Sequence, residues 1–142
     1  MTTVQYLSQI RKLDKMINNR LKEIDELRIM AENVSSMKLV SDVVKTSGRT
    51  DQLERIVVKI IDAEHIVDNL VDRYVDKRKE ITEQIESMEY VTYNVLFLRF
   101  MLNYTFSNIA KEMNGSERQI YRWYKTGIVE FEEKYGMSYK NI

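Results

Sequence analysis

Two long segments of the chain repeat hydrophobic residues at every third or fourth position. The first segment runs from about Thr3 to Glu32, and the second runs from an N-cap at Thr50 or Asp51 to about Glu86. This spacing follows the 3.6-residue period of an α-helix, so each segment predicts a helix with one hydrophobic face. These faces consist of Leu7, Ile10, Leu13, Ile17, Leu21, Ile24, Leu27, Ala31 and Val34, and of Leu53, Ile56, Ile60, Ala63, Val67, Leu70, Tyr74, Ile81, Ile85 and Met88.

The segment between these helices, residues 33–50, has no clear period and contains serines and a glycine. It is predicted to be a loop, although its length leaves room for local order. Since each one-sided helix must bury its stripe, an antiparallel hairpin within one chain is the simplest arrangement. Dimerisation through the same faces, as in a coiled coil, is the alternative. Residues 1–87 are therefore predicted to form a long helical hairpin that serves oligomerisation or docking.

The last third of the chain differs in composition, because 12 of the 14 aromatic residues lie in residues 88–142. A second domain is predicted there. Thr105 suits the N-cap of a short helix ending near Met113, and Asn114-Gly115 suits a tight turn. Ser116 and Gln119 then match a capping box at the start of another helix. A short helix, a tight turn and a second helix form the order of a helix-turn-helix.

A recognition helix places its N-terminal side chains against base edges in the major groove of DNA. Arg can read guanine, Gln can read adenine, and Glu can accept a hydrogen bond from cytosine. Residues 104–126 carry four basic and two acidic side chains, a modest net of +2, which favours binding as a dimer or with a partner. The candidate DNA-binding residues are Thr105, Lys111, Ser116, Glu117, Arg118, Gln119, Tyr121, Arg122 and Lys125, of which Thr105, Lys111, Arg122 and Lys125 suit phosphates.

The string VLFLRFMLNYTFSNIAKEMNGSERQIYRWYKTGI resembles region 4 of sigma-70-type factors. With YLSQIRKLDKMI and VVKTSGRTDQLERIVVKIIDAE, the chain resembles small phage and prophage proteins related in layout to ArpU/RinA-type activators of late genes. This resemblance implies DNA binding by the Ser116 helix, regulation of transcription, a possible contact with RNA polymerase, and a place in the cytoplasm of a bacterial host. Residues 1–87 do not resemble the promoter-melting region of a complete sigma factor, so an activator or partial sigma mimic is expected.

Composition excludes several other kinds of site and classes of protein. The 22 basic and 22 acidic residues balance, there is no Cys, and there is one His. No disulfide, thiolate metal site, phosphate-binding glycine loop, signal peptide or membrane span is predicted. We therefore expect an all-α, non-enzymatic protein without cofactor or metal. The acidic positions Asp62, Asp68, Asp72 and Asp76, with His65, are interpreted as a solvated face, with a basic partner or a metal ion as lesser alternatives.

Two other functions stay open at this point. A DNA-packaging protein of the small-terminase kind also pairs a helix-turn-helix with helical oligomerisation parts, and a ring-sized oligomer would favour it. A protein-interaction module that has lost DNA binding is the other alternative, and the modest positive charge of residues 104–126 is compatible with it. Salt-insensitive or absent DNA binding would favour that module, because phosphate contacts weaken as salt rises.

Overall fold

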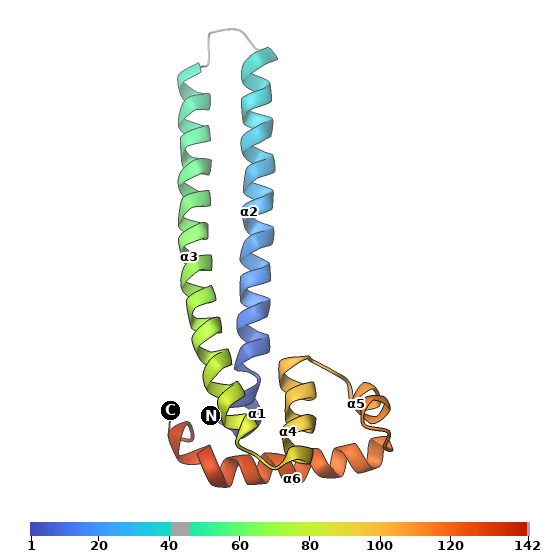
Figure 1. Cartoon of the computed structure of the whole chain (residues 1–142). Coiled ribbons are helices and arrows are strands. Elements are labelled where there is room, and N and C mark those ends of the chain that lie inside the picture. The colour runs from blue at the N-terminus through green and yellow to red at the C-terminus, as the bar shows by residue number, and fades with distance from the viewer. Residues whose placement is uncertain (41–45, 142) are drawn as a thin grey trace. The chain divides into compact units, whose positions relative to one another are not determined.

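A computed structural model describes residues 1–40 and 46–141, and the regular elements in that part of the chain are helices (Figure 1). The predicted all-α class is therefore confirmed. The elements, in chain order, are α1 (Thr3–Leu7), α2 (Gln9–Val40), α3 (Thr46–Glu86), α4 (Tyr90–Leu96), the π-helix η2 (Phe97–Met101), α5 (Phe106–Glu112), α6 (Glu117–Tyr135) and the 3₁₀-helix η3 (Gly136–Ser138).

The chain forms two compact units. One consists of Lys15–Arg73, and the other joins Met1–Asp14 to Tyr74–Ile142. Composition predicted a division after residue 87 instead. The units fall elsewhere because the beginning of the chain packs with its last third, and this pairing of distant segments leaves no local signal in composition.

Within residues 15–73, α2 and α3 lie side by side and run in opposite directions (Figure 1). Leu27, Val34 and Ile56 are buried between them, with Ala31, Leu53 and Ile60 packed against this cluster. The expected hairpin core is thus confirmed. Leu21 departs from the predicted stripe, because 44% of its surface is exposed.

The predicted loop over residues 33–50 is mostly helical, which corrects that expectation. Helix α2 continues to Val40 and α3 begins at Thr46, so the predicted N-caps Thr50 and Asp51 lie inside α3. Residues 41–45 lie outside the described part of the chain. The helices extend because Val34, seven residues after Leu27, continues the buried stripe and is itself buried. Tertiary packing of this kind overrides the weak loop preference of serine.

The helix predicted from Thr3 is divided at Ser8 into α1 and α2. Thr2 and Gln5 form a complete capping box that starts α1. The Gln9 side-chain amide then donates to the Tyr6 carbonyl at 2.9 Å. A continuous helix would offer that carbonyl to the N–H four residues later. The short α1 therefore ends where a side chain replaces the helical hydrogen-bond partner.

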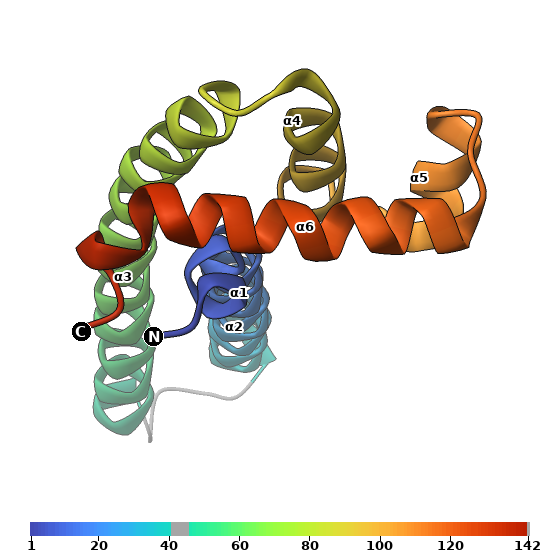
Figure 2. The same cartoon turned by 90° about the horizontal axis from the view of Figure 1, so that it is seen from below.

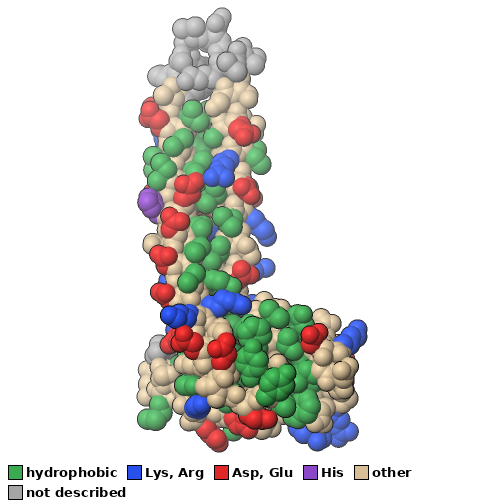
Figure 3. Space-filling model, viewed as in Figure 1, with side chains coloured by type: hydrophobic (Ala, Val, Ile, Leu, Met, Phe, Trp, Pro, Cys, Tyr) green, Lys and Arg blue, Asp and Glu red, His purple; other side chains and the backbone are tan. Residues whose placement is uncertain are grey.

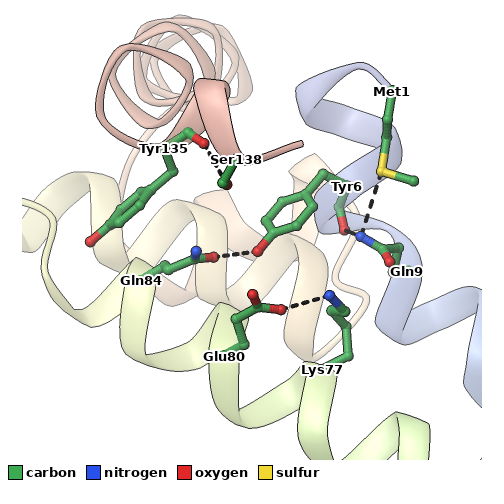
Figure 4. A network of polar contacts seen from close by, with 8 residues as sticks. All are labelled: Met1, Tyr6, Gln9, Lys77, Glu80, Gln84, Tyr135 and Ser138. Carbon is green, nitrogen blue, oxygen red and sulfur yellow. Dashed lines mark hydrogen bonds and ion pairs between the residues drawn. The ribbon is translucent and has the colours of Figure 1, made fainter. Parts of the chain in front are cut away.

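Helix α1 joins the core of the second unit. The Tyr6 ring stacks on the Tyr139 ring with 4.2 Å between centroids, and the Thr3 and Tyr139 hydroxyls lie 2.8 Å apart. The Tyr6 hydroxyl donates to Gln84 Oε1 at 2.7 Å (Figure 4). Burial raises the pKa of Tyr6 to about 12. The buried members of this core are Tyr6, Leu7, Ile10, Ile81, Ile85, Leu96, Phe100, Met101, Phe131 and Tyr139.

Candidate nucleic-acid interface

Helices α4, α5 and α6, with η2 between the first two, pack around a small core of their own. Figure 2 shows α6 passing along both α4 and α5. Four side chains of this core are buried: Val95, Ile109, Ala110 and Ile120. Trp123 is half-buried against them, which favours a packing role for its ring. The arrangement is a short helix, a turn and a longer helix supported by a preceding helix, which is the architecture of a helix-turn-helix.

Both predicted caps are present. The Thr105 hydroxyl accepts from the Asn108 N–H at 3.1 Å and starts α5. The Ser116 hydroxyl accepts from the Gln119 N–H at 3.1 Å and starts α6. These bonds satisfy N–H groups that a helix leaves without partners in its first turn. The second bond is one of the two that make a capping box.

The turn between α5 and α6 is a Schellman motif, in which two N–H groups fold back onto the end of the helix. The Gly115 N–H donates to the Ala110 carbonyl at 2.9 Å, and the Asn114 N–H donates to the Lys111 carbonyl at 3.4 Å. Asn114 has φ = 53°, a left-handed conformation that Asn tolerates well. The predicted Asn-Gly turn is confirmed, with Asn114 as the residue that takes positive φ.

Arg99 stabilises the N-terminal end of α5. Asn103 reverses the chain after η2 with φ = 58°. The Arg99 guanidinium then donates to the Tyr104 carbonyl at 2.9 Å. The same guanidinium lies 4.4 Å from the centroid of the Phe106 ring, within cation–π range. One half-buried side chain of the π-helix thus holds both the loop before α5 and the first residue of α5.

An aromatic cluster connects α5 to α6. The Phe106 ring meets the Tyr121 ring edge to face at 5.5 Å and an 87° angle, and it meets the Tyr124 ring at 5.1 Å. The Lys125 ammonium lies 4.9 Å from the Tyr121 ring centroid. Burial raises the pKa of Tyr124 above the usual value for tyrosine. These contacts fix where Tyr121 and Lys125 lie on the surface of α6.

The outward face of the N-terminal half of α6 is basic. Arg118, Arg122 and Lys125 follow one another at spacings of four and three residues, so they lie along one line of the helix. All three are exposed, and among the described residues neither arginine forms an ion pair. The opposite face of α6 packs inward, with Ile120 and Phe131 buried and Tyr124 and Ile128 half-buried.

The structure brings together four of the predicted DNA-binding residues, because Tyr121 lies beside the line of Arg118, Arg122 and Lys125. Gln119 is half-buried and lies about 100° around the helix from Arg118. Four other candidates are exposed but lie outside that line: Ser116 and Glu117 at the start of α6, and Thr105 and Lys111 near the two ends of α5.

Gly127 allows α6 to approach a neighbouring helix closely. A Cβ atom at Gly127 would lie 3.1 Å from Thr92 Cγ2 and 3.7 Å from Leu96 Cδ2, and both residues belong to α4. The close approach is therefore between α6 and the supporting helix.

Sequence reasoning missed Arg99 and Phe106 as residues that organise this site. The contact between the Arg99 guanidinium and the Phe106 ring follows the single widened turn of the π-helix. The two residues are seven positions apart in the sequence. An Arg followed by an aromatic residue seven positions later was the available signal, but it does not specify a contact.

Other site types find less support. Among the described residues, no group of three His, Cys, Asp or Glu side chains is placed to hold a metal ion. The helices within residues 1–40 and 46–141 lack the length and apolarity needed to cross a bilayer. No family model, curated protein or solved structure matches this chain.

Proposed function

We propose that this chain is a sequence-specific DNA-binding protein that regulates transcription and inserts the N-terminal half of α6 into the major groove. The observation that carries this proposal is the exposed line of Arg118, Arg122 and Lys125 on the second helix of a helix-turn-helix. Unpaired guanidinium groups on such a helix match the acceptor edges of guanine and the phosphates beside them.

The positions along α6 suggest how the roles divide. Arg118 lies in the first turn, where a recognition helix meets base edges, and we assign base reading to it. Arg122 and Lys125 lie further along and suit phosphates, as does Lys111 on α5. Tyr121 offers an exposed ring to the methyl group of thymine. Gln119 is half-buried on another side of α6, so we give it a smaller part than the sequence suggested.

The resemblance to phage and prophage regulators supports the biological setting. We propose that the chain acts on phage or prophage genes in the cytoplasm of a bacterial host, as a dimer or together with RNA polymerase. The small number of basic residues on α6 agrees with this, because a few phosphate contacts give weak binding at physiological salt. A second DNA-binding unit or a protein partner would supply the remaining affinity.

The first experiment is selection of bound duplexes from a random DNA pool, repeated at low and high salt with the full chain. An enriched motif is expected, and a palindromic motif would imply a two-fold dimer. Salt-sensitive binding without enrichment would contradict sequence-specific regulation and favour DNA packaging. Absent binding would contradict DNA recognition altogether.

The variant Arg118→Ala with Arg122→Ala tests the recognition helix directly. We expect loss of specific binding, and any residual binding should show a slope of log K against log salt reduced by about one, from the lost phosphate contact of Arg122. Helicity should not change, because both side chains are exposed. The matched control, Arg55→Ala with Arg73→Ala, removes two exposed arginines from α3. Equal binding by the two double variants would exclude α6 as the reading element.

A further inference from the structure

Helix α3 carries a second hydrophobic seam that its own hairpin does not cover. Val57, Ile61, Glu64, Asp68 and Val71 recur with alternating spacings of four and three residues, the heptad pattern by which helices pack. The apolar members leave 43% (Val57), 47% (Ile61) and 38% (Val71) of their surface in water. A neighbouring seam on α3 already packs against α2 through Ile56 and Leu53. Two seams on one helix are typical of a helix with two neighbours.

Helix α2 extends this surface. The Arg28 guanidinium pairs with Glu64 at 3.1 Å across the hairpin, and both side chains are about half exposed. The side of α2 that bears Arg28 therefore borders the seam. Leu21, seven residues before Arg28, shares that side and is 44% exposed. Figure 3 shows hydrophobic side chains gathered along the hairpin with acidic ones among them.

The polar members of this surface are mostly acidic. The surface carries three acidic side chains and one basic side chain, Arg28, so its net charge is −2. The acidic side chains are Asp25, Glu64 and Asp68. This charge argues against a second copy of α3 as the occupant. In an antiparallel pair with Ile61 opposite Val71, Glu64 would lie opposite Asp68, and in a parallel pair it would lie opposite its own copy. Either arrangement brings like charges together between apolar contacts, which is unfavourable.

We propose that this seam binds a basic amphipathic helix of a partner protein. Its apolar side chains would lie against Val57, Ile61 and Val71, and its Lys or Arg side chains would pair with Glu64 and Asp68. This is the helix-in-groove mode, in which apolar anchors at helical spacing supply affinity and charges set the register. The proposal concerns residues 15–73 and does not depend on DNA binding by α6.

The test uses the full chain and a synthetic helical peptide labelled with a fluorophore. The peptide carries Leu opposite Val57, Ile61 and Val71, and Lys opposite Glu64 and Asp68. A second peptide replaces only those two lysines by glutamates. Fluorescence anisotropy at low and high salt is expected to show binding of the lysine peptide that weakens with salt, and at least tenfold weaker binding of the glutamate peptide.

Two protein variants locate the binding surface. Ile61→Lys should abolish peptide binding. Ile66→Lys is the matched control, because Ile66 is also an exposed isoleucine but lies on the other side of α3, and it should leave peptide binding unchanged. Glu64→Gln with Asp68→Asn should weaken the lysine peptide about fivefold, as two exposed ion pairs are lost. Equal binding of both peptides, or equal effects of the two lysine variants, would overturn the proposal. So would sedimentation showing a dimer that Ile61→Lys dissociates, because a second copy would then occupy the seam.

Discussion

Arg99 shows how one side chain sets the geometry of a surface that it does not itself form. Its guanidinium holds the Tyr104 carbonyl and the Phe106 ring, and Phe106 in turn contacts Tyr121 on the basic face of α6. A charged donor of this kind forms stronger hydrogen bonds than a neutral one. The planar guanidinium can also serve a carbonyl and a ring together, which an ammonium group cannot do equally well.

We predict that Arg99→Ala lowers the free energy of unfolding of the helix-turn-helix unit by about 1–2 kcal/mol, from the lost hydrogen bond and cation–π contact. Arg99→Lys should recover only part of it. Urea unfolding followed by Trp123 fluorescence measures both values. Arg122→Ala serves as the control, and an equal loss there would show that the effect comes from charge alone.

Gly127 offers a second test at the residue scale. Gly127→Ala should destabilise the unit by about 0.5–1 kcal/mol even though alanine favours helices. The reason is the 3.1 Å approach to Thr92 Cγ2, on a side chain fixed by its hydrogen bond to Glu130 at 3.0 Å. Adding Thr92→Ser, which removes the methyl and keeps the hydroxyl, should restore stability. Failure of this rescue in urea unfolding would place the strain elsewhere.

At the scale of elements, the sequence predicted what local chemistry determines. The starts of α5 and α6 were predicted because Thr105 and Ser116 act within three residues of themselves. The hydrophobic faces of α2 and α3 were predicted by their period. The helical extension to Val40 and the break at Ser8 were not, because the first depends on burial across the hairpin and the second on one side-chain amide.

The attachment of α1 makes stability sensitive to alkaline pH. Because burial raises the pKa of Tyr6 to about 12 from a usual value of 10, the folded state holds this proton more tightly than the unfolded chain. The contribution is complete below pH 10 and declines as the pH rises toward 12. Burial also raises the pKa of Tyr139 and Tyr124. Urea unfolding at successive pH values should therefore show a falling free energy above pH 10.

Tyr6→Phe should make the free energy of unfolding fall less steeply with pH above pH 10. The variant also loses the hydrogen bond to Gln84. An unchanged slope would assign the pH dependence to the other two tyrosines.

On the scale of the whole molecule, the two units are expected to respond separately to core mutations. Leu7 is fully buried with the C-terminal helices, whereas Leu27 is buried inside the hairpin. Trp123, the only tryptophan, reports on the helix-turn-helix. We predict that Leu7→Ala lowers the free energy of unfolding seen by Trp123 by about 2–4 kcal/mol.

Leu27→Ala is the matched variant in the other unit. It should leave the Trp123 fluorescence transition unchanged. The loss of far-ultraviolet ellipticity that comes from the hairpin should move to a lower urea concentration. If both variants moved both signals equally, the chain would unfold as one cooperative body.

The stacking of Tyr6 on Tyr139 also determines the order in which the protein can form during synthesis. The ribosome releases the Tyr6 ring long before the Tyr139 ring. The hairpin of residues 15–73 can close while the chain is still growing, since its contacts are complete once that segment has emerged. The unit that carries α6 cannot form until Tyr139 has emerged, so Tyr6 and Leu7 lack their C-terminal partners until then. A nascent chain stalled before Tyr139 would therefore present a folded hairpin joined to an unfinished helix-turn-helix unit.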